Sequence, residues 1–141
     1  MTDNIEILKD IMQKGIPILF LGAGFSYGST NKEGELPTGE KLTEDIFNYF
    51  IKGKVEPIEE KEIEKYDLQD MCQTVNDYLN QSKDLKEYLF KRFKHAKPEE
   101  FHYNLLSYPW RRIYTVNIDD IVENIYRKSD IKIVVQNSEK E

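Results

Sequence analysis

The chain has 141 residues, of which 39% are hydrophobic and 33% charged, and its net charge of −6 at pH 7 provides no basic excess for general nucleic-acid binding. No apolar run approaches the roughly 18 residues of a membrane span, and the amino terminus has no signal-peptide core. The single cysteine, Cys72, excludes internal disulfides and cysteine-rich zinc modules, and we expect one domain of a cytoplasmic protein.

A helix and an apolar strand are predicted first. Residues 3–14 have helical spacing, with one apolar face formed by Ile5, Leu8, Ile11 and Met12. The near-continuous apolar run over residues 16–21 is typical of a strand that is covered on both faces. A polar, glycine-containing loop follows this strand.

The middle of the chain is predicted to be a helical insertion over residues 38–107. Its first helix, residues 38–51, is expected to bury Leu42, Ile46, Tyr49 and Phe50. The charged stretch 52–65 is interpreted as a solvated connection with a partial helix, rather than as an acidic binding tail. Two further helical stripes are formed by Leu68, Met71, Cys72, Val75 and Leu79 and by Leu85, Leu89 and Phe93. Pro98 suits the first turn of another short helix that carries Phe101 and Leu105.

The last part of the chain returns to strands. Residues 112–116 are predicted to form a second strand, a helix carries Ile118, Ile121, Val122 and Ile125, and residues 131–135 form a third strand. This order implies an α/β fold with a right-handed parallel unit and a helical insertion between the first and second strands. Three strands make a thin sheet, so the sequence is consistent with a domain that is incomplete at residue 141.

A glycine loop directly follows the first predicted strand. Gly22 and Gly24 flank Ala23, and glycines at these positions allow a phosphate-bearing ligand to approach the backbone closely. The full dinucleotide fingerprint is absent, because Tyr27 stands where its sixth position requires glycine. A tight strand-to-helix turn would also favour this pattern. Ser26 could donate to a phosphate or face solvent.

A polar cluster follows the second predicted strand. Asn117 offers a donor and an acceptor for a sugar hydroxyl or a water, although it could also be a turn residue. Asp119 or Asp120 could simply cap the following helix. Because ligand sites lie at the carboxyl ends of parallel strands, we expect Ala23 and Asn117 at the rim of one crevice.

Together these segments resemble the sirtuin and sirtuin-like family of NAD-consuming enzymes. The matching residues are Gly22-Ala23-Gly24-Phe25-Ser26, Leu36-Pro37-Thr38-Gly39 and Thr115-Val116-Asn117-Ile118-Asp119, with Pro98, His102, Leu105 and Leu106 between them. The pattern looks most like bacterial sirtuin-like NAD hydrolases that act as effectors in antiphage defence.

The resemblance implies a Rossmann-like domain that takes NAD as its substrate, requires no metal and works as a homo-oligomer or with a fused or partner effector domain. It assigns catalytic roles to Asn117 and Asp119. It assigns NAD binding to Gly22, Ala23, Gly24, Phe25, Ser26, Pro37, Thr115, Asn117, Ile118 and Asp119.

The sequence departs from deacylase sirtuins in three ways. Residues 37–40 read Pro-Thr-Gly-Glu where those enzymes have Pro-Asp-Phe-Arg, and Cys72 alone cannot supply their four-cysteine zinc module. No histidine follows Asn117, so the family's downstream base has no counterpart, and His102 is interpreted as a packing residue. We therefore expect NAD hydrolysis rather than peptide deacylation. The alternatives are a non-catalytic module that senses NAD or ADP-ribose and gates a partner domain, and an α/β domain that acts only in assembly.

Overall fold

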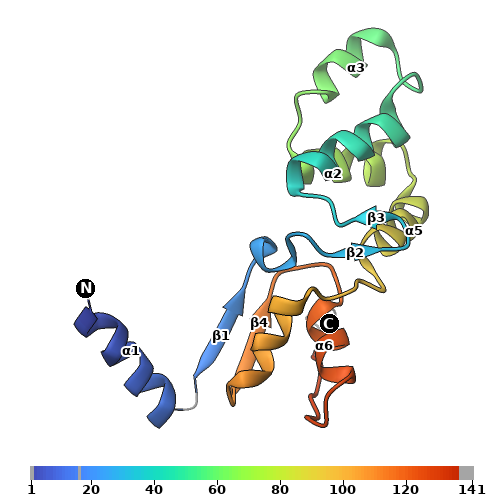
Figure 1. The fold of residues 1–141 in the computed structure, drawn as a ribbon. Helices are drawn as coiled ribbons and strands as arrows, with labels where there is room; N and C mark the ends of the chain where they lie inside the picture. The colour runs from blue at the N-terminus through green and yellow to red at the C-terminus, as the bar shows by residue number, and fades with distance from the viewer. Residues whose placement is uncertain (1, 16, 137–141) are drawn as a thin grey trace. The chain divides into compact units, whose positions relative to one another are not determined.

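The computed structural model describes residues 2–15 and 17–136 (Figure 1). They form two compact units. The strand unit combines Met1–Ser29 with His95–Glu141, and the helical unit is Thr30–Lys94. Among the described residues, no helix combines the length and the apolarity that crossing a bilayer would require.

The strand unit contains a parallel pair of strands, as predicted. Its elements are α1 (Thr2–Lys14), β1 (Ile18–Leu21), η1 (Ala23–Ser26), η4 (Glu100–Ser107), β4 (Arg112–Thr115) and α6 (Ile121–Arg127). Strands β1 and β4 lie side by side, with Ile18 opposite Arg112 and Leu21 opposite Thr115 (Figure 1). The chain is therefore mixed α/β, and the whole helical unit is inserted between the two strands in sequence.

The predicted third strand does not form in the described part of the chain. Residues 131–136 follow α6 without regular structure, and the apolar side chains of Ile131 and Val134 are exposed. Alternating apolar residues make a strand only where a neighbouring strand supplies hydrogen-bond partners. Among the described residues, the parallel sheet therefore has two strands, β1 and β4.

The prediction that the first strand is covered on both faces is also wrong for the described residues. Leu19 and Leu21 are half-buried, whereas Phe20, which points to the other face, is 75% exposed. Phe20 stacks on Tyr114 of β4, with ring centroids 5.1 Å apart. Helix α1 forms as predicted, but Ile5, Leu8 and Ile11 on its apolar face are exposed. Residue 16, the predicted start of the strand, lies outside the described residues.

The helical unit contains the larger hydrophobic core. Its elements are β2 (Thr30–Asn31), β3 (Gly34–Glu35), α2 (Gly39–Ile46), the π-helix η2 (Phe47–Ile51), α3 (Pro57–Ile63), α4 (Leu68–Gln73), the π-helix η3 (Thr74–Tyr78) and α5 (Ser82–Phe93). Its buried side chains come from the predicted stripes, and they are Leu42, Ile46, Phe47, Phe50, Ile51, Ile63, Met71, Val75, Leu85 and Phe93. Tyr49 is an exception: we predict it to be buried, but it is 59% exposed.

Local hydrogen bonds explain where these helices begin and end. The Thr38 hydroxyl accepts from Lys41 N and begins α2, and the Asp67 carboxylate accepts from Asp70 N and begins α4. Asn31, the last residue of β2, donates its amide hydrogens to the carbonyls of Lys91, Arg92 and Lys94 at the end of α5. The charged stretch contains the partial helix α3, as predicted.

The helical unit, Thr30–Lys94, begins and ends earlier in the sequence than the predicted insertion of residues 38–107. The short helix η4 belongs to the strand unit, where it packs with α6. In this predicted helix Leu105 is buried and Phe101 is exposed. The strand unit also has buried residues, among them Ala96, His102, Leu105, Ile121, Asn124, Ile125 and Tyr126.

Candidate functional site

The two polar motifs of the strand unit meet at one edge of the parallel sheet. Because Leu21 lies opposite Thr115, the glycine loop and the segment after β4 leave the sheet together. The side-chain amide of Asn117 donates from Nδ2 to the carbonyl oxygen of Gly22 at 3.0 Å and to Ser26 Oγ at 2.9 Å. The structure therefore brings these two motifs, 95 residues apart in sequence, into direct contact.

Ser26 connects the two motifs through a second bond. Its hydroxyl donates to Asp119 Oδ2 at 2.5 Å, and the residue is only 8% exposed. Ser26 is thus part of the cluster and does not face solvent. The other carboxylate oxygen of Asp119, Oδ1, accepts from Ile121 N at 3.1 Å at the start of α6. Asp119 therefore caps a helix and also orients the cluster.

One atom of this cluster has an unused hydrogen-bonding capacity. Asn117 Oδ1 is buried and has no partner among the described residues. The amide cannot be turned round to pair it, because the Gly22 carbonyl can only accept and so requires Nδ2 to face it. A buried acceptor without a partner costs about 1–3 kcal/mol. A ligand hydroxyl or a water that donates to Asn117 Oδ1 would remove this cost.

The glycines of the loop are not required by the backbone. Gly22 has an extended conformation, with φ −113° and ψ −176°, and Gly24 is not among the described glycines with positive φ. A Cβ atom built on either residue meets no atom of the described residues within 4 Å, apart from its neighbours in the chain. The tight-turn alternative therefore does not explain these glycines, whereas the open space beside them would let a ligand approach the main chain.

The loop also presents backbone donors. The first hydrogen bond of η1 runs from Phe25 N to Gly22 O at 3.0 Å, so the N–H groups of Ala23 and Gly24 precede it. Both residues are exposed. These two N–H groups can donate to an anionic oxygen that reaches the loop.

His102 is hydrogen-bonded to the backbone of the glycine loop. It is 0% exposed, its Nδ1 accepts from Glu99 N at 2.8 Å, and its Nε2 lies 2.5 Å from the carbonyl oxygen of Phe25. Since a carbonyl only accepts, Nε2 must carry the proton. The rings of Phe25 and His102 pack edge to face, 4.8 Å apart. His102 is therefore a packing and positioning residue, as predicted, with both nitrogens in use.

Asp120 has a structural role that the sequence does not indicate. Its carboxylate accepts from the backbone N–H groups of His95 and Ala96, at 3.0 and 2.9 Å, and from Asn124 Nδ2 at 2.9 Å. It occupies the cap position of α6, but these bonds join the start of that helix to the segment that leads into η4. Only the tertiary structure identifies Asp120 as this clamp.

An open groove of about 680 Å³ borders the end of the glycine loop. It is lined by Tyr27, Gly28, Glu99, Glu100, Phe101 and Asn104. Tyr27 and Phe101 are exposed, and the Phe101 ring stacks on His102 with centroids 3.9 Å apart. The described lining thus combines two aromatic rings and two carboxylates with no basic side chain. The local sequence does not indicate this groove, because Tyr27 stands out only as a departure from the dinucleotide fingerprint and Phe101 only as a residue of a short helix.

The other predicted site residues have structural roles or lie apart from the three-residue cluster. Thr115 Oγ1 accepts from Asn117 N at 3.0 Å and so shapes the turn after β4. Ile118 is exposed, and Phe25 is half-buried against His102. Pro37 belongs to the helical unit.

Comparison with known proteins identifies no relative. No family model, no curated protein and no solved structure matches this chain. The function proposed below therefore depends on the geometry of this site and on the resemblance of its motifs.

Proposed function

We propose that the strand unit is a Rossmann-like, sirtuin-like domain that binds NAD and hydrolyses it to nicotinamide and ADP-ribose. The observation that supports this most is the cluster of Ser26, Asn117 and Asp119 beside the open glycine loop. Ligands of open parallel sheets bind at this edge.

The chemistry of the site fits the three parts of NAD. The N–H groups of Ala23 and Gly24 suit the pyrophosphate, because backbone donors bind anionic oxygens without a basic side chain. The unpaired acceptor Asn117 Oδ1 suits a ribose hydroxyl. The nicotinamide ring of NAD is cationic, and the exposed rings and carboxylates of the adjacent groove suit a flat cation.

The reaction requires little acid–base chemistry. The bond between ribose C1′ and the nicotinamide nitrogen breaks with its electron pair going to the ring, which leaves as a neutral molecule. Water adds to C1′ and releases its proton to solvent. The transition state resembles the oxocarbenium ion of glycoside cleavage, so the main task of the protein is to orient the ribose and stabilise positive charge. In this proposal, Asn117 orients a ribose hydroxyl or the water, and the Asp119 carboxylate stabilises the cation.

The test is nicotinamide release by an Asn117→Ala variant. We expect release to fall by roughly 10²-fold, the usual consequence of removing one preorganised polar group. Asn48→Ala, at an exposed position of the helical unit, is the matched control and should leave release unchanged. Chromatographic measurement of nicotinamide and ADP-ribose, with circular dichroism to verify folding, provides the readout. Equal release by the wild type and Asn117→Ala would remove Asn117 from the mechanism.

A second candidate is a module that senses NAD or ADP-ribose without turnover and gates a partner domain. Hydrogen bonds within the chain already occupy Asn117 Nδ2, both oxygens of Asp119 and both nitrogens of His102. This arrangement favours binding over proton transfer. Measurable NAD affinity with no nicotinamide release would support the sensing module, whereas turnover would exclude it.

The wider role suggested by the resemblance is that of an antiphage effector, acting as a homo-oligomer or with a fused or partner domain. Such an effector would deplete NAD in the cytoplasm when it is activated. Expression of the chain in bacteria, with and without Asn117→Ala, tests this role through the cellular NAD level.

A further inference from the structure

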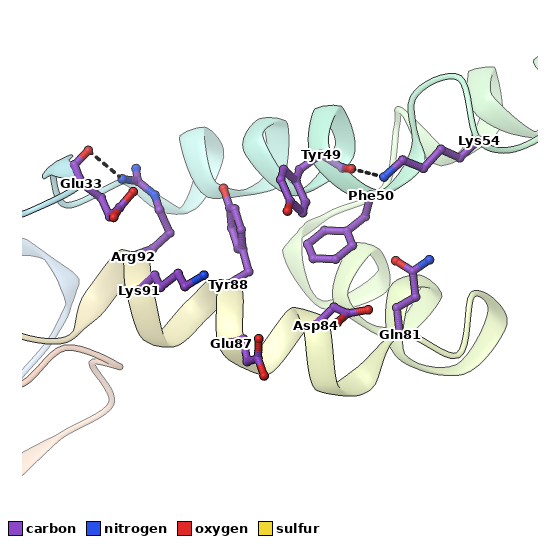
Figure 2. Close-up of a pocket in the computed structure, with 10 residues that line it drawn as sticks. All are labelled: Glu33, Tyr49, Phe50, Lys54, Gln81, Asp84, Glu87, Tyr88, Lys91 and Arg92. Carbon is purple, nitrogen blue, oxygen red and sulfur yellow. Dashed lines mark hydrogen bonds between the residues drawn. The ribbon is translucent and has the colours of Figure 1, made fainter.

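A second groove, of about 630 Å³, lies in the helical unit between η2 and α5 (Figure 2). Tyr49 and Phe50 project into it from η2, and Tyr88 and Arg92 project into it from α5. Its lining contains three basic side chains, those of Lys54, Lys91 and Arg92, and three acidic ones. The groove is therefore balanced in charge, with aromatic rings at its centre.

The aromatic rings form a continuous wall. Tyr49 and Tyr88 lie 5.2 Å apart at 33°, and both contact Phe50, whose side chain is only 1% exposed. The π-helical geometry of η2 changes the helical phase and leaves the Tyr49 ring on the surface, where it contributes little to the core. Single π-helical turns occur frequently at functional sites. An exposed ring of this kind offers a stacking surface to a planar molecule.

Arg92, at one end of this wall, makes only a long ion pair among the described residues. Its side chain is only 16% exposed and is hydrogen-bonded to the Tyr88 side chain, but its contacts with oxygens of other elements are long: Nη1 to Glu33 O is 3.4 Å, and Nη2 to Asp45 Oδ2 is 3.6 Å. Charge-assisted bonds are usually about 2.7–2.9 Å long. Asp45 already pairs with Lys41 at 2.9 Å, and Arg92 Nε is buried with no partner among the described residues. The guanidinium thus has capacity for an additional anionic acceptor.

Lys54, at the other end, already contacts the chain and supports the wall. Its Nζ donates to the carbonyl oxygen of Tyr49 at 2.5 Å and lies 5.4 Å from the centroid of the Tyr49 ring. The two ends of the groove therefore differ. At one end, Lys54 is already bonded to the backbone. At the other, Arg92 has an unpaired Nε and lies next to the exposed Lys91.

We propose that this groove binds a planar aromatic molecule that carries one anionic group. The ring would stack on Tyr49 and Tyr88, and the anion would pair with Arg92. A mononucleotide and an aromatic carboxylate share this chemistry. Because the acidic side chains balance the basic ones, a free anion without a ring should bind only weakly. This site differs from the proposed NAD site, since all of its residues belong to the helical unit.

Nuclear magnetic resonance titration of the full 141-residue chain tests the proposal, with AMP, adenosine, inorganic phosphate and 4-hydroxybenzoate as probes. We expect AMP to shift backbone signals over residues 47–54 and 85–93. Adenosine and phosphate should each bind about tenfold more weakly, because each lacks one of the two contacts. The relative affinities of AMP and 4-hydroxybenzoate distinguish a nucleotide from an aromatic carboxylate. Signals that shift only in the strand unit would overturn the proposal.

Matched variants locate the contacts. Tyr49→Ser should weaken AMP binding in the helical unit by about tenfold, whereas Tyr78→Ser, which removes another exposed tyrosine of the same unit, should not. Arg92→Lys should weaken it because lysine lacks the planar fork, and Lys86→Gln on the same helix serves as its control. Equal effects of Tyr49→Ser and Tyr78→Ser would overturn the proposal. Neither tyrosine variant should alter nicotinamide release, so this test is separate from that of the proposed function.

Discussion

Replacement of the loop glycines by alanine separates a folding role from a ligand role. A Cβ atom at Gly22 or Gly24 lies more than 4 Å from the other described residues beyond its chain neighbours, and neither glycine has a positive φ. Alanine should therefore be accommodated, and it should stabilise the fold by about 0.4–1 kcal/mol because it restricts the unfolded chain. The melting temperature of both variants should equal or slightly exceed that of the wild type.

NAD binding should respond in the opposite direction. The added methyl group would occupy the space through which a phosphate reaches the N–H groups of Ala23 and Gly24. Loss of one charge-assisted hydrogen bond costs about 1.5–3 kcal/mol, which corresponds to an increase in Kd of about 10- to 150-fold. Isothermal titration calorimetry with NAD measures this change.

Two other glycines provide controls. Gly39→Ala, in the first turn of α2, also meets no atom within 4 Å and should leave the NAD affinity unchanged. Gly15→Ala would place its Cβ 2.9 Å from Ile11 O, so it should lower the melting temperature and verify that the assay detects a clash. Unchanged NAD affinity in both Gly22→Ala and Gly24→Ala would refute the assignment of the loop to the ligand.

Three further predictions concern the supporting residues. His102→Ala should lower the free energy of unfolding, measured by urea denaturation, by about 3 kcal/mol, because it leaves the Phe25 carbonyl and the Glu99 N–H unpaired. A loss below about 0.5 kcal/mol would contradict the positioning role. Asp120→Ala should cost about 2–3 kcal/mol by the same measurement, since three donors lose their acceptor, and a neutral effect would show that the clamp is dispensable. Burial raises the pKa of the Cys72 thiol, so alkylation should be slow near neutral pH and should accelerate only above the pH at which a free cysteine ionises. Rapid alkylation of the folded chain at pH 7 would contradict this prediction.

The helical unit is predicted well because its signals are local. The stripes that contain Met71, Val75 and Leu85 follow from helical spacing, and each of these residues is buried in the structure. The predicted burial of Tyr49 is wrong for a physical reason, since the π-helical turn changes the helical phase that the spacing assumes. No feature of the local sequence marks that turn.

The candidate site is predicted in part. That the glycine loop and Asn117 meet at one edge follows from the geometry of parallel strands. The third strand and the roles of Asp120 and Tyr27 depend on partners that are remote in sequence. A strand requires a neighbour, the Asp120 clamp requires the backbone of Ala96, and the Tyr27 groove requires η4. These contacts exist only after folding.

The most direct test of the central claim is the response of the loop to NAD itself. In a heteronuclear NMR titration, NAD should shift the backbone amides of Ala23 and Gly24 and the side-chain amide of Asn117, and Asn117→Ala should weaken this binding. Titration to millimolar NAD with no change at these three residues would contradict the assignment of an NAD site to this edge of the sheet.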